Sequence, residues 1–154
     1  MILDGGHQIP MLQDVLKLMK GRAALNIELK DTQIADNIHQ IVSGYSQKPE
    51  WSEEQFIVSS FDWEELRAYR GYSPQGRIAV LTEGDPLEAI PVAKELGAEA
   101  INPHFTQLNA GNVAKLHEAG FKVYTWTVND PADYQKLKEM GVDGVFSDYP
   151  DRMK

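Results

Sequence analysis

Short apolar segments rich in β-branched and aromatic residues alternate along this chain with longer segments of helical period. The apolar segments predict buried strands. Their centres lie roughly 20 to 30 residues apart, a spacing that suits parallel strands joined by helices and is too long for hairpins. The predicted strands are Ala24–Leu29, Phe56–Ser60, Arg77–Leu81, Ala98–Asn102, Lys122–Thr127 and Gly144–Ser147.

The segments between the strands carry apolar residues three and four positions apart, which predicts amphipathic helices. The faces are Leu12/Val15/Leu16/Met19, Ile34/Ile38/Ile41, Leu87/Ile90/Ala93/Lys94, Val113/Leu116/His117 and Tyr134/Leu137/Lys138. Glycines at 21, 97, 120 and 141 stand just before strands, where a left-handed helix end favours glycine. The expected helix N-caps are Asp31 or Thr32, Asp62, Asp85, Thr106 and Asn129 or Asp130. The pattern is therefore a βα repeat with right-handed crossovers.

A βα repeat forms either an open doubly wound sheet or a closed eight-stranded barrel. No glycine-rich phosphate loop follows the first strand, and polar residues recur at the carboxyl ends of almost every strand, which favours the barrel. A complete barrel needs eight strands over about 250 residues, and this chain has six in 154. The segment 1–21 holds no convincing strand, so we expect one domain, 1–154: an incomplete (β/α)8 barrel lacking its first two strands.

The composition and charge of the chain argue against several classes of function. The net charge is −8 and the 15 Lys and Arg residues are scattered, which argues against a nucleic-acid or anionic-membrane partner. There is no cysteine, so thiol chemistry is excluded and a reducing compartment, the cytoplasm, is expected. No stretch approaches the roughly 20 apolar residues of a membrane helix. The first 20 residues, with Asp4, Pro10 and Asp14, do not resemble a signal peptide.

Glu28 and Lys30 lie two positions apart in the apolar segment Leu25–Lys30. Side chains at that spacing share one face of a strand. If that face lines the inside of a barrel, the carboxylate can bind a cation and the ammonium a phosphate. If it faces solvent, the two form an ion pair that contributes little. Spacing alone leaves both interpretations open.

Five segments, in order and spacing, resemble the glycerophosphodiester phosphodiesterase family across essentially the whole chain. They are Ile9–Leu16, Ile27–Lys30, Val58–Phe61, Trp126–Asn129 and Gly141–Pro150. The chain departs from the family at Met11 and Ser147, where threonine is usual. The resemblance implies a barrel that hydrolyses glycerophosphodiesters to an alcohol and glycerol 3-phosphate with a divalent cation, Mg²⁺ or Ca²⁺.

The resemblance also implies roles for single residues. Glu28 matches the metal-binding glutamate of the third family strand, Lys30 the lysine beside the phosphate, and Trp126 the tryptophan near the glycerol pocket. The family's catalytic histidines, in an HRG-like strand and an HD motif, have no counterpart here, so no catalytic residue is assigned. The loop Asp4–His7 then corresponds to the tail of a family insertion.

Other readings of these residues remain open. Trp126 can equally be an aromatic of the barrel core. Asn129 and Asp148 are expected to cap the turns that follow them. His39 and His117 are expected on helix surfaces, whereas His104 follows a strand and can face the barrel mouth without a motif that supports catalysis.

Two functions are therefore expected as alternatives. In the first, the chain is part of a glycerophosphodiester phosphodiesterase and is inactive alone, because the acid and base histidines are missing. In the second, it is a non-catalytic barrel remnant that binds or oligomerises, with homodimers forming through the open edges of the sheet. Another βα enzyme, such as an isomerase or lyase, is disfavoured because no glycine-rich loop follows Lys122–Thr127.

Overall fold

The computed structural model describes residues 8–154, and the loop Asp4–His7 lies outside the described residues. In this described part of the chain, six parallel strands form one sheet in the order in which they occur in the sequence. They are β1 (Leu25–Glu28), β2 (Phe56–Ser60), β3 (Arg77–Thr82), β4 (Ala100–Pro103), β5 (Lys122–Thr125) and β6 (Gly144–Val145).

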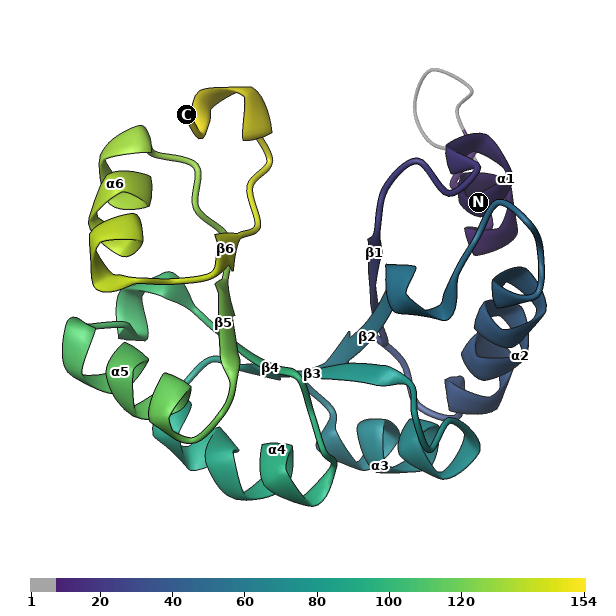
Figure 1. Ribbon diagram of the computed structural model, residues 1–154, viewed down its shortest axis with the longest axis horizontal. Helices are drawn as coiled ribbons and strands as arrows, with labels where there is room; N and C mark the ends of the chain where they lie inside the picture. The colour runs from purple at the N-terminus through teal and green to yellow at the C-terminus, as the bar shows by residue number, and fades with distance from the viewer. Residues whose placement is uncertain (1–7) are drawn as a thin grey trace.

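Within residues 8–154, six α-helices and four short 3₁₀ helices precede, connect or follow these strands. The α-helices are α1 (Leu12–Met19), α2 (Ala35–Ser46), α3 (Trp63–Tyr72), α4 (Ile90–Glu95), α5 (Ala110–Glu118) and α6 (Pro131–Met140). The 3₁₀ helices are η1 (Glu53–Gln55), η2 (Pro86–Ala89), η3 (Phe105–Gln107) and η4 (Pro150–Arg152). The helices lie along the outer side of the curled sheet (Figure 1).

The sheet curls without closing, so β1 and β6 form its two edges (Figure 1). Strand–helix alternation, parallel pairing and curvature together make a partial (β/α)8 barrel. The sequence prediction of six βα units is confirmed, and the opening between β1 and β6 lies where a closed barrel has two more strands.

The two faces of the sheet differ in chemistry. Apolar side chains of the outer face, such as Val58, Ile78 and Val123, are fully buried against the helices in the main core. Burying one such side chain contributes roughly 1.5–3 kcal/mol. The alternate positions, among them Glu28, Ser59 and Asn102, face the concave side. Strand periodicity therefore separates a structural face from a face available for chemistry.

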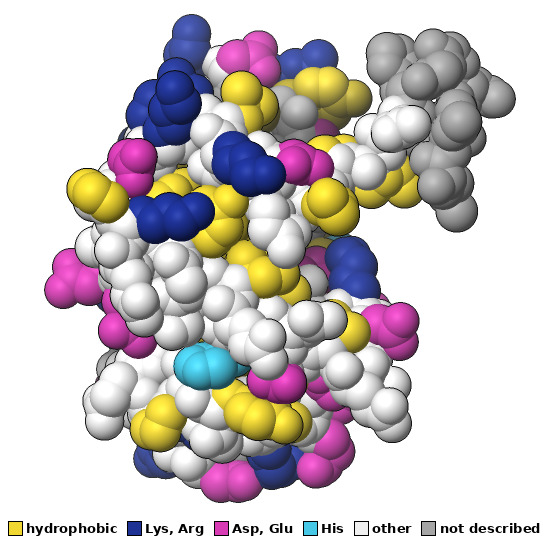
Figure 2. All heavy atoms as spheres, turned by 90° about the vertical axis from the view of Figure 1, so that its right-hand side faces the viewer, with side chains coloured by type: hydrophobic (Ala, Val, Ile, Leu, Met, Phe, Trp, Pro, Cys, Tyr) yellow, Lys and Arg dark blue, Asp and Glu magenta, His cyan; other side chains and the backbone are white. Residues whose placement is uncertain are grey.

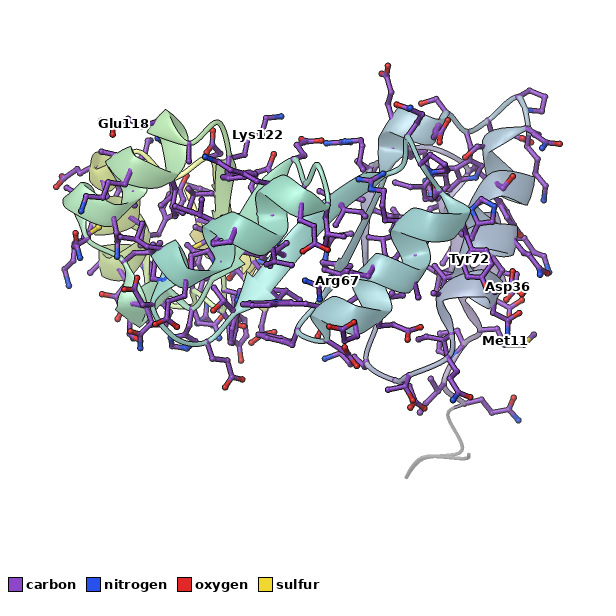
Figure 3. All side chains as sticks on the ribbon, turned by 90° about the horizontal axis from the view of Figure 1, so that it is seen from below. Met11, Asp36, Arg67, Tyr72, Glu118 and Lys122 are labelled. Atoms are coloured by element: carbon purple, nitrogen blue, oxygen red, sulfur yellow. The ribbon has the colours of Figure 1, made fainter. Side chains whose placement is uncertain are left out.

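The helix α3 has no counterpart among the predicted helix faces. Its buried residues Leu66 and Tyr69 have helical spacing, but charged residues dominate the segment and hide that signal. Arg67 on α3 instead binds Glu95 on α4, with 2.7 Å between Nε and Oε1 (Figure 3). The predicted strand ends also shift: β4 begins two residues later than expected, and β5 and β6 each end two residues earlier.

Three of the predicted caps are confirmed. Asp62, Asp85 and Asp130 accept backbone N–H groups at the starts of α3, η2 and α6. The predictions for Asp31, Thr32 and Thr106 are wrong. Asp31 only accepts the N–H of Thr32, Asn109 caps α5, and His104 precedes η3. The start of α2 is bound instead by a side chain from α3, described below.

A charged cluster joins the amino ends of the central strands, at the opposite end of the sheet from the polar carboxyl ends. Arg77 donates to both oxygens of Glu99, at 2.5 and 2.8 Å, and Lys122 donates to Oε1 at 2.9 Å. The hydrogen bond from Arg77, with a weaker one from Lys122, lowers the pKa of Glu99 to about 2 although burial opposes the shift. Residues at this end of a barrel serve stability rather than chemistry.

Glycine is required at the end of α1. Gly21 has φ 66°, and a Cβ atom there would overlap the carbonyl oxygen of Glu50. Its own carbonyl accepts the side-chain amide of Gln55 at 2.7 Å. The tight turn from α1 to β1 therefore depends on the missing side chain.

The outer surface beside α1 and α2 carries both apolar and charged side chains (Figure 2). Figure 2 shows exposed apolar side chains lying between charged side chains of both signs. Ile9, Met11 and Leu18 are among the exposed apolar residues of the chain. Within residues 8–154, no helix has the length and apolar content needed to cross a membrane.

Candidate functional site

A pocket of about 320 Å³ lies at the carboxyl ends of the strands. It brings together the three residues that the sequence predicts for a binding site: Glu28, Lys30 and Trp126. The remaining lining residues are Asn26, Phe61, Leu81, Thr127 and Phe146. These lining residues are spread over the sequence from Asn26 to Phe146. They meet in one place because the parallel strands end at the same edge of the barrel.

Glu28 and Lys30 share one face, as the spacing predicts. The Lys30 Nζ atom lies 3.3 Å from Glu28 Oε2. The Lys30 side chain is 78% exposed and that of Glu28 is 28% exposed. Solvent screens an ion pair of this kind, so it adds little to stability. Because the Lys30 side chain is mostly exposed, its ammonium is also accessible to an anion that enters the pocket.

The peptide between these two residues is fixed by β2. The N–H of Leu29 donates to the carbonyl of Ser59 at 2.7 Å, and the buried Ser60 hydroxyl donates to the carbonyl of Leu29 at 2.7 Å. Glu28 and Lys30 therefore leave the backbone on either side of a residue that is bound at both of its polar groups.

Trp126 is partly buried and lines the pocket, so it does not belong to the enclosed core. Its indole N–H donates to the carbonyl of Asn102 at 2.9 Å. The rings of Phe61 and His104 meet it edge to face at centroid distances of 5.2 and 4.8 Å. Aromatic pairs in this geometry stabilise one another beyond the area they bury, and here they hold the indole as a fixed wall of the pocket.

His104 lies near the mouth of the barrel, but its ring nitrogen Nδ1 interacts with its own loop. Its Nδ1 atom lies 2.8 Å from the Thr106 hydroxyl and accepts the Thr106 N–H at 3.4 Å. His117 binds Asp143 at 2.9 Å, and His39 packs against Tyr72. Of these three histidines, none lines the pocket.

The prediction that Asn129 and Asp148 cap their following turns is wrong in detail. Asp130, not Asn129, caps α6. The Asn129 amide instead donates to Asp148 Oδ2 at 2.9 Å and accepts the Asp148 N–H at 3.0 Å. These two residues join the loop after β5 to the loop after β6, and the Ser147 hydroxyl accepts the N–H of Tyr149.

The sequence placed polar residues such as Asn102 at the strand ends but did not reveal their surroundings. Asn102 is fully buried, and neither its amide nitrogen nor its amide oxygen has a protein hydrogen-bond partner. Also on the concave face, Asn26 donates to the Ser59 hydroxyl at 2.9 Å. An asparagine within the apolar segment Ala98–Asn102 was the available signal, because buried amides normally need partners.

Among the described residues that line the pocket, only Glu28 carries a carboxylate that could bind a divalent cation. Within residues 8–154, no three histidine, aspartate or glutamate side chains are grouped so that they could hold a metal ion. Calcium needs about six to eight oxygen ligands and magnesium an octahedron. Glu28 with water does not meet that need, so the pocket residues do not by themselves form a complete site for either cation.

The arrangement can still bind. It offers one ammonium for a phosphate, one carboxylate for a cation or hydroxyl, and an aromatic wall of Trp126 and Phe61 for carbon atoms. These groups suit a small anionic ligand that also has an apolar or polyol part.

The chain is similar to known proteins over almost its whole length. Residues 3–152 match the model of the Glycerophosphoryl diester phosphodiesterase family. The protein YhdW of Bacillus subtilis, described as a candidate glycerophosphodiester phosphodiesterase, is 31% identical over 153 residues, which are 95% of this chain and 61% of YhdW. This chain thus spans about three fifths of the length of the curated relatives it matches.

Solved structures show the same fold. A Galdieria sulphuraria protein, described as a candidate glycerophosphodiester phosphodiesterase, has a TM-score of 0.83 and 26% identity, with 98% of this chain and 65% of that chain covered. A phosphodiesterase of Oleispira antarctica in complex with its product sn-glycerol-3-phosphate has a TM-score of 0.76 and 23% identity, with 91% and 56% covered. The partial barrel therefore corresponds to part of a larger barrel in these proteins.

Proposed function

The chain belongs to the glycerophosphoryl diester phosphodiesterase family, and from this premise we propose that its pocket forms one side of a site for glycerophosphodiesters. The observation that carries the proposal is the meeting of Glu28, Lys30 and Trp126 around one pocket at the carboxyl ends of the strands. These residues lie at or just after the carboxyl ends of β1 and β5, about a hundred positions apart in the chain.

Each of the three residues has a proposed role. The Lys30 ammonium, largely exposed in the pocket, binds phosphate oxygens and stabilises charge that develops on them. Trp126 packs against the carbon atoms of the glycerol part. Glu28 contributes one ligand to a divalent cation, Mg²⁺ or Ca²⁺, whose other ligands come from outside the described residues together with water.

We propose further that this chain alone does not turn over glycerophosphodiesters, since no histidine of the described residues lines the pocket. Purified protein should release no choline or ethanolamine from glycerophosphocholine or glycerophosphoethanolamine, with Mg²⁺ or Ca²⁺ present. Hydrolysis that disappears in Glu28→Ala would contradict the proposal and would reveal an acid or base not identified among these residues.

A second function, oligomerisation, is favoured by the open sheet. The edge strands β1 and β6 line a cavity of about 340 Å³, with contributions from Leu25, Tyr124 and Val145. Unpaired strand edges present free backbone donors and acceptors to another chain. We propose that two copies pair through these edges. Light scattering over a micromolar dilution series should show a dimer, and a monomer at every concentration would refute this.

A further inference from the structure

The segment from Leu29 to Ala35, which carries Lys30, is bound at both ends by the βα unit that follows it. We infer that Ser60 and Glu65 are positioning residues, which set where Lys30 presents its ammonium to the pocket. The inference rests on the proposed function of Lys30 and adds the means by which that residue is fixed.

Ser60 forms the first anchor. Its hydroxyl is buried and donates to the carbonyl of Leu29 at 2.7 Å, one residue before Lys30. The same oxygen accepts the N–H of Asp62 at 3.0 Å. One hydroxyl therefore ties the end of β1 to the start of α3, where Asp62 caps the helix.

Glu65 forms the second anchor. Its side chain lies on α3, and the residue is 6% exposed. Its carboxylate accepts three backbone N–H groups, from Gln33 at 2.9 Å, Ile34 at 2.8 Å and Ala35 at 2.7 Å. These are donors at the start of α2 that lack a partner within the helix.

The segment needs this outside partner. Ile34 stands at the N-cap position of α2 and has no side chain able to cap it. Gln33 has φ 61°, a conformation that residues with side chains rarely adopt. A buried carboxylate at a helix start is also favoured by the helix dipole. Glu65 thus supplies in one group the cap and the charge that the sequence of α2 lacks.

Glu65 also affects where an anion can bind. The N–H groups at a helix start are a common binding place for phosphate, and here the protein's own carboxylate fills them. A phosphate in the pocket therefore meets Lys30, whose side chain is mostly exposed, and not the backbone of α2. Between the anchors, Asp31 binds only the N–H of Thr32, so the two anchors decide the path of the loop.

The simpler view is that Glu65 only stabilises α2. Three substitutions in the full chain separate the two views. Glu65→Gln keeps the shape of the side chain but replaces one acceptor oxygen with a donor. Ser60→Ala removes the other anchor with a minimal change and keeps the inference testable if Glu65→Gln fails to fold. Asn109→Ala removes the cap of α5, across the sheet from β1, and is the matched control (Figure 1).

The experiment is an NMR titration with inorganic phosphate that follows the Lys30 side chain, alongside amide hydrogen exchange. Glu65→Gln and Ser60→Ala should each weaken phosphate binding roughly tenfold, because a misplaced binding group loses most of its effect. Asn109→Ala should leave the affinity unchanged. In one outcome, amide exchange at Gln33–Ala35 becomes faster in Glu65→Gln while the phosphate affinity is unchanged in both Glu65→Gln and Ser60→Ala. That outcome would overturn this inference and leave the proposed function intact. Absence of phosphate binding at Lys30 in the unsubstituted protein would overturn the proposed function and this inference together.

Discussion

Single residues show how far strand alternation carries a functional prediction. A period of two placed Glu28 and Lys30 on one face, and the structure brings them within 3.3 Å at the pocket. The same rule could not reveal that Lys30 is mostly exposed, because exposure depends on neighbours distant in sequence. Glu65 gave no signal at all, since its partners Gln33 and Ala35 lie some 30 positions away.

Trp126 offers a test of the pocket at the residue scale. Trp126→Phe should cost about 1 kcal/mol of stability through loss of the hydrogen bond to Asn102. Trp126→Ala should cost about 3 kcal/mol, because the contacts with Phe61 and His104 are also lost. Urea unfolding of the variants measures both losses.

Trp63→Phe is the matched control. The Trp63 indole N–H also donates to a backbone carbonyl, that of Leu81, at 3.0 Å. Trp63 itself does not line the pocket. Both Trp126 variants should weaken binding of sn-glycerol 3-phosphate, and Trp63→Phe should not. If Trp126→Ala loses stability yet binds this ligand normally, the role of Trp126 in the pocket is wrong.

Elements were predicted well where one signal dominated. Glycines at helix ends and aspartate caps marked most boundaries because these residues act through their own backbone. The helix α3 was missed because only Trp63, Leu66 and Tyr69 form its apolar stripe, among many charges. The cap of α2 was assigned to Asp31 or Thr32 because a cap contributed by another helix leaves no local pattern.

The turn from α1 to β1 yields a prediction for glycine. Gly21→Ala should destabilise the protein by about 3 kcal/mol or more, since left-handed strain adds to overlap with the Glu50 carbonyl. Gly141→Ala, also at a positive φ but with open space around it, should cost about 1–2 kcal/mol from strain alone. Thermal unfolding compares the two, and equal losses would show that the contact with Glu50 is not restrictive.

The charged cluster at the amino ends of β3 to β5 gives a pH dependence. The pKa of Glu99 is lowered from 4.5 to about 2 in the folded protein, chiefly by the hydrogen bond from Arg77. A lowered folded pKa stabilises the protein above the unfolded value, and this contribution is lost as pH falls from about 4.5 towards about 2. Glu99→Gln should be less stable at neutral pH and should lose less stability on acidification. Parallel acid titration curves for the two proteins would rule out this role.

At the scale of the whole molecule, the count of six strands and their common direction followed from the spacing of apolar segments, and the partial barrel confirms both. Sequence pattern favoured a curled, incomplete barrel, but it could not give the cavity between β1 and β6, which depends on how all the strands twist together. The hydrogen bond from Asn26 to Ser59 and the burial of Asn102 without a partner likewise emerged only when the strands were placed side by side.

The most direct test of the account is titration of the protein with sn-glycerol 3-phosphate, observed by NMR. Saturable shifts should appear at the Lys30 side chain and at the Trp126 indole N–H, which line one pocket. Lys30→Ala should abolish the shift at Trp126, whereas Lys136→Ala, on the exposed surface of α6, should not. Absence of saturable shifts, or shifts at Trp126 that persist in Lys30→Ala, would contradict the assignment of this pocket to glycerophosphodiesters.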